Sequence, residues 1–303
     1  MPCGPAQVPP SPPAPVVRLA LMPAPVAPVA LLLVSYGSGN EIAACLTSLK
    51  NSTVQPKHIL VADNLGDDAL AAQLKPWAKQ IELHTYPDNP GYGGAINRLM
   101  SAVPSGEADW LLVVNPDVTF EADALERLIA GADASAVGSA GPRVLDENGS
   151  VYPSARQVPS IGTGIGHALF GKVWPANPWT TKYLNRVSLD HPSDVGWLSG
   201  ACVLVRADAF ASIGGFDDAF FMYFEDVDLG YRLGLNGWAN RYVPAAIVHH
   251  SGGHSTKDRS AAMRTAHHRS AEQFLKHRYP GPFGALIRWP LALGLRLRSR
   301  LGG

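Results

Sequence analysis

Residues 110–117 read WLLVVNPD, and this short segment decides the fold. Five apolar residues in succession, from Trp110 to Val114, are typical of a strand that is buried on both faces of a parallel sheet. The strand ends at Asn115, because Pro116 has no backbone N–H to donate and disfavours helix at the residue before it. Asp117 therefore follows the carboxyl end of a central strand, the edge of an open α/β sheet where ligands bind. A carboxylate there can bind a divalent cation, and the cation can bind a diphosphate.

The same alternation of strand and helix extends along most of the chain. Apolar runs predict strands at residues 29–34, 59–62, 81–85, 110–114, 136–144, 201–205 and 246–248. The first of them ends in Ser35 and Tyr36, and the second ends in Asp63 and Asn64. Helical patterns of apolar residues separate the first four strands, and this alternation predicts a doubly wound, mostly parallel sheet.

A glycine-rich segment at residues 89–94 opens the helix that carries Asn97. The segment is neither a G-x-G-x-x-G dinucleotide fingerprint nor a phosphate loop that ends in Gly-Lys-Ser/Thr. Gly93 and Gly94 at the start of a helix can expose backbone N–H groups to an anion, or they can allow close packing. Both interpretations stay open at this point.

Three carboxylates, Glu225, Asp226 and Asp228, follow the aromatic run at residues 220–224. Aromatic surroundings raise a carboxylate's pKa toward the working range of a general base. On a helix, Asp226 and Asp228 point about 200° apart and cannot serve one site together. Because Asp228 stands four residues before Arg232, we expect these two to form an ion pair. Glu225 or Asp226 is left as the candidate base.

The strand predicted at residues 246–248 ends in His249 and His250, with His254 beyond, and a histidine at this strand end is a candidate metal ligand in a chain that also has Asp117. A zinc site formed by the three histidines is the competing interpretation, but no cysteine joins them and no H-E-x-x-H motif occurs. The three cysteines are scattered without metal spacing, which suits a reducing cytosol.

The balance of 25 basic and 25 acidic residues gives no overall field that would favour nucleic acid. Residues 1–28 are rich in proline and are expected to be a disordered tail, with Met22 as an alternative start. Residues 153–194 are irregular and rich in aromatics, which is typical of a binding loop or lid, with disorder as the alternative.

No acidic residue follows Glu272, and leucines alternate with arginines near the end of the chain. That pattern indicates an interfacial membrane anchor, or else a solvated basic tail.

Taken in order, these motifs resemble the inverting family 2 glycosyltransferases of GT-A fold, between residues 29 and 256. The segments that carry the resemblance are residues 34–36, 63–64, 89–97, 115–117, 196–206, 214–217, 225–229 and 249. Two departures are visible: Asn115 replaces the first acid of the family's D-x-D motif, and residues 63–68 replace its usual D-N-G-S-x-D. The resemblance implies a Rossmann-like sheet with a smaller acceptor-side sheet. It also implies a nucleotide-sugar half at 29–145, an acceptor and catalytic half at 146–256, and a helical, membrane-associating segment at 257–303.

The resemblance also implies roles for single residues. Nucleotide-sugar contacts are expected from Ser35, Tyr36, Asp63, Asn64, Gly93, Asn97, Asn115, Asp117 and Trp197. Asp117 and His249 are expected to bind Mg²⁺ or Mn²⁺ on the donor diphosphate. Asp226, beside Glu225, is expected to remove the proton from the attacking hydroxyl of the acceptor. Trp197 and the 153–194 loop are expected to shape the acceptor side.

A narrower resemblance lies in residues 149–157, 174–181 and 250–256, which are similar to actinobacterial rhamnosyltransferases of this family. It implies transfer of L-rhamnose from dTDP-L-rhamnose to polyprenyl-diphospho-N-acetylglucosamine, for the linker between arabinogalactan and peptidoglycan. Such an enzyme would be cytoplasmic, at the inner face of the membrane. Two alternatives stay open: a related transferase for another sugar nucleotide, such as a galactofuranosyl donor, and an inactive protein that binds nucleotide-sugar or lipid-linked glycan.

Overall fold

The computed structural model describes residues 24–158, 174, 176, 190–252, 260–286 and 288–290. Most of the predicted tail with Met22, most of the 153–194 loop, and residues 291–303 lie outside the described residues. The first elements are β1 (Val26–Ser35), α1 (Gly39–Lys50), β2 (Gln55–Asp63), α2 (Asp68–Gln73), η1 (Lys75–Trp77), β3 (Glu82–Thr85), α3 (Gly91–Ala102), β4 (Trp110–Val114), β5 (Val118–Phe120) and α4 (Ala124–Gly131). They are followed by β6 (Val137–Leu145), β7 (Val151–Tyr152), β8 (Ala155–Arg156), β9 (Ser193–Val195), β10 (Trp197–Leu198), β11 (Cys202–Arg206), α7 (Ala207–Ser212), α8 (Glu225–Leu235), β12 (Ala239–His250) and α9 (Ser260–Arg278).

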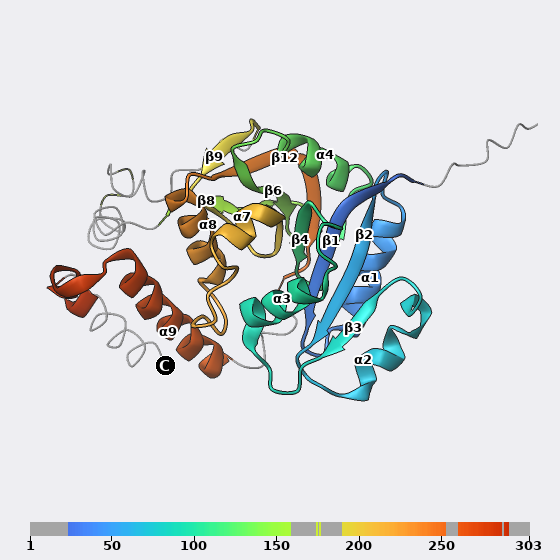
Figure 1. Cartoon of the computed structure of the whole chain (residues 1–303), viewed down its shortest axis with the longest axis horizontal. Coiled ribbons are helices and arrows are strands. Elements are labelled where there is room, and N and C mark those ends of the chain that lie inside the picture. Colours follow the sequence, from blue (N-terminus) through green and yellow to red (C-terminus); the bar gives the residue numbers. More distant parts are fainter. Residues whose placement is uncertain are drawn as a thin grey trace, which may run out of the picture.

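One large sheet runs through the molecule in the order β3-β2-β1-β4-β11-β6-β12-β5 (Figure 1). The strands β3, β2, β1 and β4 are parallel to one another, as the alternation of strands and helices predicts. The strand β11 runs antiparallel between β4 and β6, and β12 is parallel to β6. The predicted mostly parallel α/β sheet is confirmed, and its second half is mixed.

The predicted central strand is β4, and all five of its residues are buried. Helices cover both faces of the sheet (Figure 1). Residues from α1 and α4 join Leu31 and Leu33 of β1 in one core cluster. Residues from α3, α7 and α8 join Leu32 of β1 in the other cluster. Each cluster draws residues from both halves of the chain, so the two halves share one folded body.

The predicted tail is too long at its inner end, because Val26 already belongs to β1. Val26 and Ala27 lie opposite Gln55 and Pro56 in the parallel ladder. Pro28 donates no backbone hydrogen bond, but its carbonyl accepts one from the N–H of Asp109 at 2.8 Å. A proline next to a register shift is therefore compatible with the start of this strand.

A second, two-stranded sheet formed by β8 and β10 is also present, as predicted. Beside it, α9 packs on the aromatic segment that precedes α8. Phe274 of α9 is buried against Phe220 and Val227, and Ser270 donates a hydrogen bond to the carbonyl of Met222 at 2.8 Å. Among the described helices, none has the length and apolar character that a membrane span requires.

Candidate active site

The carboxyl ends of β1 and β2 meet at one edge of the sheet, where Ser35 lies opposite Asp63. Both side chains are buried and hold their own loops. The Oγ of Ser35 accepts a hydrogen bond from the N–H of Ser38 at 3.1 Å, and Oδ1 of Asp63 accepts one from the N–H of Leu65 at 3.0 Å. Tyr36 is 37% exposed at the same edge. Ser35 and Asp63, both predicted nucleotide contacts, therefore hold the loops that follow β1 and β2.

The start of α3 is anchored to this edge and to the aromatic segment. The amide of Asn64 donates hydrogen bonds to the carbonyl of Gly91 at 3.1 Å and to the side chain of Asn89 at 3.2 Å. Gly91 has a φ of +80°, and a Cβ there would lie 2.3 Å from the carbonyl oxygen of Phe221. Only glycine tolerates both conditions.

Gly93 and Asn97, two further predicted nucleotide contacts, hold the loop at Phe216 onto α3. A Cβ at Gly93 would lie 2.8 Å from Cβ of Phe216, which is the packing interpretation of this glycine. The side chain of Asn97 donates to the carbonyl of Phe216 at 2.8 Å and accepts from its N–H at 2.9 Å. The side chain of Asn97 thus fixes the backbone of Phe216, the residue that follows Gly215.

Asp117 is brought next to His250, and not next to the predicted ligand His249. The Nε2 of His250 lies 3.1 Å from Oδ1 of Asp117, whereas Nε2 of His249 lies 3.4 Å from a carboxylate oxygen of Glu121. Successive residues of a strand point to opposite faces of the sheet, so only one of the two histidines can face Asp117. In the antiparallel pair of β12 and β5, His250 lies opposite Val118, directly after Asp117.

This pair has the chemistry of a site for a hard divalent cation. Burial alone would raise the pKa of Asp117, but the hydrogen bond and charge of His250 outweigh it and lower the pKa below its ordinary value. Asp117 is therefore a carboxylate at neutral pH. The side chains of Asp117 and His250 are 15% and 17% exposed, and the amide of Asn115 lies 3.5 Å from His250. One carboxylate and one imidazole would leave coordination positions for diphosphate oxygens and water.

The two candidate bases lie in the first turn of α8. Tyr223 and Phe224 immediately before them have positive φ values of 68° and 65°, a strained conformation that is often found at functional sites. The carboxylate of Asp226 accepts hydrogen bonds from the N–H of Gly200 at 3.0 Å and from the N–H of Val227 at 2.8 Å. The carbonyl of Gly200 in turn accepts from the hydroxyl of Tyr92 at 2.9 Å.

A short backbone link joins this base to the metal candidate. The N–H of Asn115, two residues before Asp117, donates to the carbonyl of Ala201 at 2.9 Å. The residue before Ala201 is Gly200, which binds Asp226. Asp117 and Asp226 are 109 positions apart in the sequence, and these hydrogen bonds link their segments.

The pKa values of both acidic residues are raised. Burial, together with the charge of Asp226, raises the pKa of Glu225 to about 8. Burial also raises the pKa of Asp226, although its hydrogen bonds from Gly200 and Val227 oppose the shift. Within the described part of the chain, Oε2 of Glu225 is buried without a hydrogen-bond partner. Asp226 is the better candidate for a base, because its backbone donors favour the carboxylate form.

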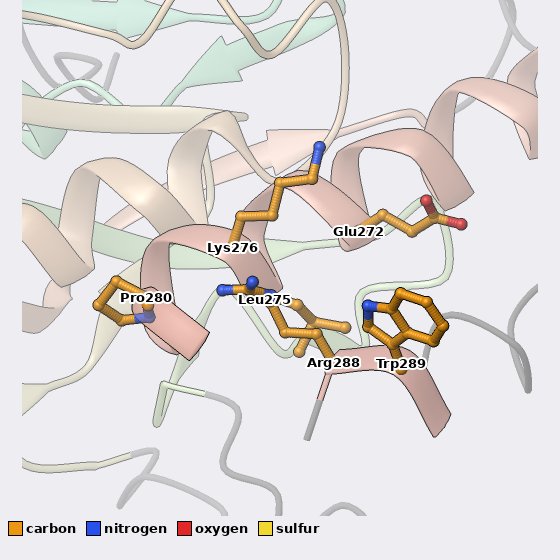
Figure 2. Close-up of a pocket in the computed structure, with 7 residues that line it drawn as sticks. Glu272, Leu275, Lys276, Pro280, Arg288 and Trp289 are labelled. Carbon is orange, nitrogen blue, oxygen red and sulfur yellow. The ribbon is translucent and has the colours of Figure 1, made fainter. Parts of the chain in front are cut away.

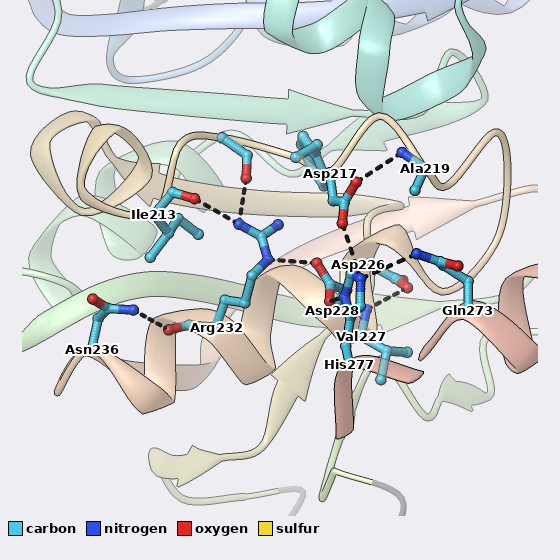
Figure 3. A network of polar contacts seen from close by, with 12 residues as sticks. Ile213, Asp217, Ala219, Asp226, Val227, Asp228, Arg232, Asn236, Gln273 and His277 are labelled. Carbon is cyan, nitrogen blue, oxygen red and sulfur yellow. Dashed lines mark hydrogen bonds and ion pairs between the residues drawn. The ribbon is translucent and has the colours of Figure 1, made fainter. Parts of the chain in front are cut away.

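The third carboxylate, Asp228, is the centre of a separate polar network (Figure 3). Its predicted ion pair with Arg232 is confirmed, at 2.5 Å. His277 of α9 joins them, with Nδ1 at 2.8 Å from Asp228 and Nε2 at 3.3 Å from Asp217. The ligand atoms of Asp217, Asp228 and His277 lie within 4.8 Å of one another, a spacing that a metal could use. However, the guanidinium of Arg232 already balances Asp228, so Asp117 and His250 are the better metal candidates. No feature of the sequence indicates the role of His277, which lies in a polar helix 49 residues after Asp228.

Trp197 lies in β10, where its indole N–H donates to the carbonyl of Gln157 at 3.2 Å. Its strand partner is Arg156 of β8. The indole therefore lies between the small sheet and α8, where Gly230 leaves room for it: a Cβ at Gly230 would lie 2.6 Å from Cβ of Trp197. Trp197 is half-buried and close to the helix that carries Asp226.

The end of α9 forms a hollow of about 450 Å³ together with the helical turns that follow it (Figure 2). Leu275 and Lys276 of α9 line it with Arg288 and Trp289. Three large apolar side chains on the same following segment are strongly exposed: Phe283 is 85%, Leu286 75% and Trp289 79% exposed. Aromatic and basic side chains together at a surface are typical of a segment that contacts lipid.

The sheet order, the edge at Asp117 and the acids at the start of α8 are those expected of a GT-A fold. Residues 25–272 match the family described as glycosyltransferase like family 2, and the chain belongs to that family and is a glycosyltransferase. Among its relatives is N-acetylglucosaminyl-diphospho-decaprenol L-rhamnosyltransferase of Mycobacterium tuberculosis, with 42% identity over 89% of this chain and 91% of the relative. Rhamnosyltransferase WbbL of Escherichia coli is 28% identical over 76% of this chain and 85% of its own length.

Solved structures agree on the fold. The mannosyltransferase PcManGT from Pyrobaculum calidifontis, in complex with GDP-Man and Mn²⁺, aligns with a TM-score of 0.56 and 14% identity over 92% of this chain and 73% of its own. GalNAc-T7 with UDP, GalNAc and Mn²⁺ aligns with a TM-score of 0.53 and 14% identity over 74% of this chain and 43% of its own. At this level of identity the similarity shows the GT-A fold alone.

Proposed function

We propose that this glycosyltransferase transfers L-rhamnose from dTDP-L-rhamnose to polyprenyl-diphospho-N-acetylglucosamine with inversion, in synthesis of the arabinogalactan linker of the cell wall. The observation that carries the proposal is the 42% identity to a decaprenol-linked rhamnosyltransferase along almost the whole of both chains. The pair of Asp117 and His250, together with Asp226 at the start of α8, supports an active enzyme over an inactive binding protein.

In this proposal the loops around Ser35, Tyr36, Asp63 and Asn64 receive the nucleoside of the donor. Asp117 and His250, with Asn115 nearby, would hold Mg²⁺ or Mn²⁺, which would neutralise charge on the diphosphate leaving group. Asp226 removes the proton from the acceptor hydroxyl as that oxygen attacks the anomeric carbon from the face opposite the leaving group. A single displacement of this kind inverts the anomeric carbon. Trp197 offers an apolar surface to a sugar ring on the acceptor side.

The lipid of the acceptor requires access to a membrane, and the C-terminal surface supports a peripheral location at the inner face of the cell membrane. Exposed Phe283, Leu286 and Trp289 can enter the headgroup region of a bilayer. Lys276 and Arg288 beside them can pair with anionic lipids.

Product analysis tests the proposal directly. The purified enzyme is incubated with Mn²⁺, dTDP-L-rhamnose and a short-chain polyprenyl-diphospho-N-acetylglucosamine, and the product is identified by mass spectrometry and by the anomeric coupling in its NMR spectrum. A rhamnosylated lipid of inverted configuration is expected. A panel with UDP-galactofuranose and other sugar nucleotides runs in parallel, and transfer from one of those instead of dTDP-L-rhamnose would contradict the donor assignment.

A further inference from the structure

Arg156 is an arginine whose side chain is held in place near Asp226. It lies in β8 directly opposite Trp197 of β10. Its guanidinium carbon is 5.5 Å from the centre of the indole ring, and its Nε donates a hydrogen bond to the carbonyl of Pro153 at 2.7 Å. These two contacts orient the guanidinium while the residue as a whole stays exposed.

The charge of Arg156 is not balanced by an acidic partner in the part of the chain that the structure describes, where its only side-chain hydrogen bond is the one to Pro153. Other exposed arginines of this protein do have such partners. Arg98, which also lies over an aromatic ring, pairs with Asp88 at 2.6 Å. The Nη groups of Arg156 are therefore available for an anion. Two parallel N–H donors of a guanidinium match a phosphate better than any other side chain does.

Arg156 is also close enough to Asp226 to affect its ionisation. The positive charge of Arg156 is among the influences that lower the pKa of Asp226 against the effect of burial. The partner strand supplies the physical connection, because Gly200, which donates to Asp226, follows Trp197 by three residues. An anion bound at Arg156 would therefore lie beside the group that accepts the proton.

We propose that Arg156 binds the diphosphate of the lipid-linked acceptor, and that Trp197 supports the adjoining sugar so that its hydroxyl reaches Asp226. This inference rests on the proposed function. In such an acceptor the diphosphate is attached directly to the sugar that is attacked, so its binding group has to lie about one sugar ring away from the base. The donor diphosphate has a separate candidate site at Asp117 and His250. Arg156 would thus make the enzyme select an anionic, lipid-linked sugar over a neutral glycoside.

Binding and kinetics with two acceptors test this assignment. The acceptors are a short-chain polyprenyl-diphospho-N-acetylglucosamine and a neutral alkyl glycoside of N-acetylglucosamine with a similar tail. The full-length wild-type protein is compared with Arg156→Gln, Arg156→Lys and the matched control Arg98→Gln. Calorimetry without donor gives the affinity for each acceptor, and initial rates with dTDP-L-rhamnose give KM for donor and acceptor separately.

Arg156→Gln should weaken binding of the diphosphate acceptor by about 10- to 100-fold, the range expected for loss of a charge-assisted pair. Binding of the neutral glycoside and KM for the donor should change by no more than about twofold. The affinity of Arg156→Lys for the diphosphate acceptor should lie between those of wild type and Arg156→Gln, because lysine keeps the charge but lacks the two parallel N–H donors of a guanidinium. Arg98→Gln should bind both acceptors as the wild type does.

Three results would overturn the inference. Equal loss for both acceptors would mean that Arg156 only supports Trp197. A higher KM for the donor alone would assign Arg156 to the donor diphosphate. Wild-type protein that binds both acceptors equally would mean that no diphosphate site exists. Failure of rhamnosyl transfer with acceptor binding still weakened in Arg156→Gln would contradict the proposed donor and leave the role of Arg156 supported. Arg156→Lys decides the question if Arg156→Gln does not fold.

Discussion

The substitution Asp226→Asn separates the chemical role of this carboxylate from its structural one. Both carboxylate oxygens accept backbone hydrogen bonds, from Gly200 at 3.0 Å and from Val227 at 2.8 Å. An amide has a single acceptor oxygen, so one of these N–H groups would face an NH₂ group. Leaving one donor unsatisfied costs about 1–3 kcal/mol of stability. Each kcal/mol lowers Tm by about 2–4 °C in a domain of 150–250 residues, and by less in a longer chain such as this one. The variant should therefore stay folded at 25 °C.

The loss of activity should be much larger than the loss of stability implies. A missing general base lowers kcat by about 10²- to 10⁴-fold, which corresponds to about 3–5 kcal/mol in the barrier. The assay is kcat for rhamnosyl transfer at saturating donor and acceptor, well below the Tm of the variant. Calorimetric affinity for dTDP should be unchanged, because the base acts on the acceptor.

The pH profile gives an independent measure of the same role. The pKa of Asp226 is raised above its ordinary value. The rate of the wild type should therefore rise with pH, and the midpoint of this ascending limb should lie above the ordinary pKa of an aspartate. Asp226→Asn should lose this limb. A normal turnover rate for Asp226→Asn together with an inactive Glu225→Gln would identify Glu225 as the base. Normal turnover in both variants would refute the mechanism.

Four further outcomes are expected. His250→Ala should abolish the increase in dTDP affinity that Mn²⁺ produces, while His249→Ala should retain it; the reverse result in calorimetry would return the metal site to His249. The folded pKa of Glu225 is about 8, against an ordinary value of 4.5, so its contribution to stability is complete below pH 4.5 and is lost as pH rises toward 8. The Tm of Glu225→Gln relative to wild type should therefore rise from pH 5 to pH 8, and parallel curves would contradict the raised pKa. Truncation after Pro280 should release the protein from anionic vesicles in co-sedimentation, and equal sedimentation of both forms would locate the membrane contact elsewhere. His277→Ala should lower stability by about 1–3 kcal/mol, because buried Asp228 loses a donor; an unchanged urea midpoint would remove α9 from the network.

The sequence by itself determines the parallel half of the sheet, whose carboxyl edge carries Ser35, Asp63 and Asp117. The run at residues 110–114 is short, apolar throughout and followed by Asn-Pro, which predicts a strand covered on both faces, and β4 has the predicted bounds. The polar residues after each strand then have to meet at one edge, because parallel strands share their direction. The ion pair of Asp228 and Arg232 is likewise determined by the pitch of one helix.

Contacts between distant segments are different, because hydrophobic periodicity is the same for a strand that runs in either direction. The antiparallel β11 between β4 and β6 therefore could not be read from the chain, although its residues were predicted as a strand. The roles of Gly93 and Asn97 also depend on a partner, Phe216, that lies 119 residues after Asn97.

The choice between His249 and His250 illustrates where the sequence stops and the tertiary structure decides. Alternation along a strand establishes that the two imidazoles point to opposite faces, but it does not say which face carries Asp117. That was decided by the antiparallel pairing of β12 with β5, which lies at the far end of the sheet order. The pairing of Arg156 with Trp197 and the contact of His277 with Asp228 have the same origin. In each case the energy comes from packing and hydrogen bonding between segments that only the complete fold brings together.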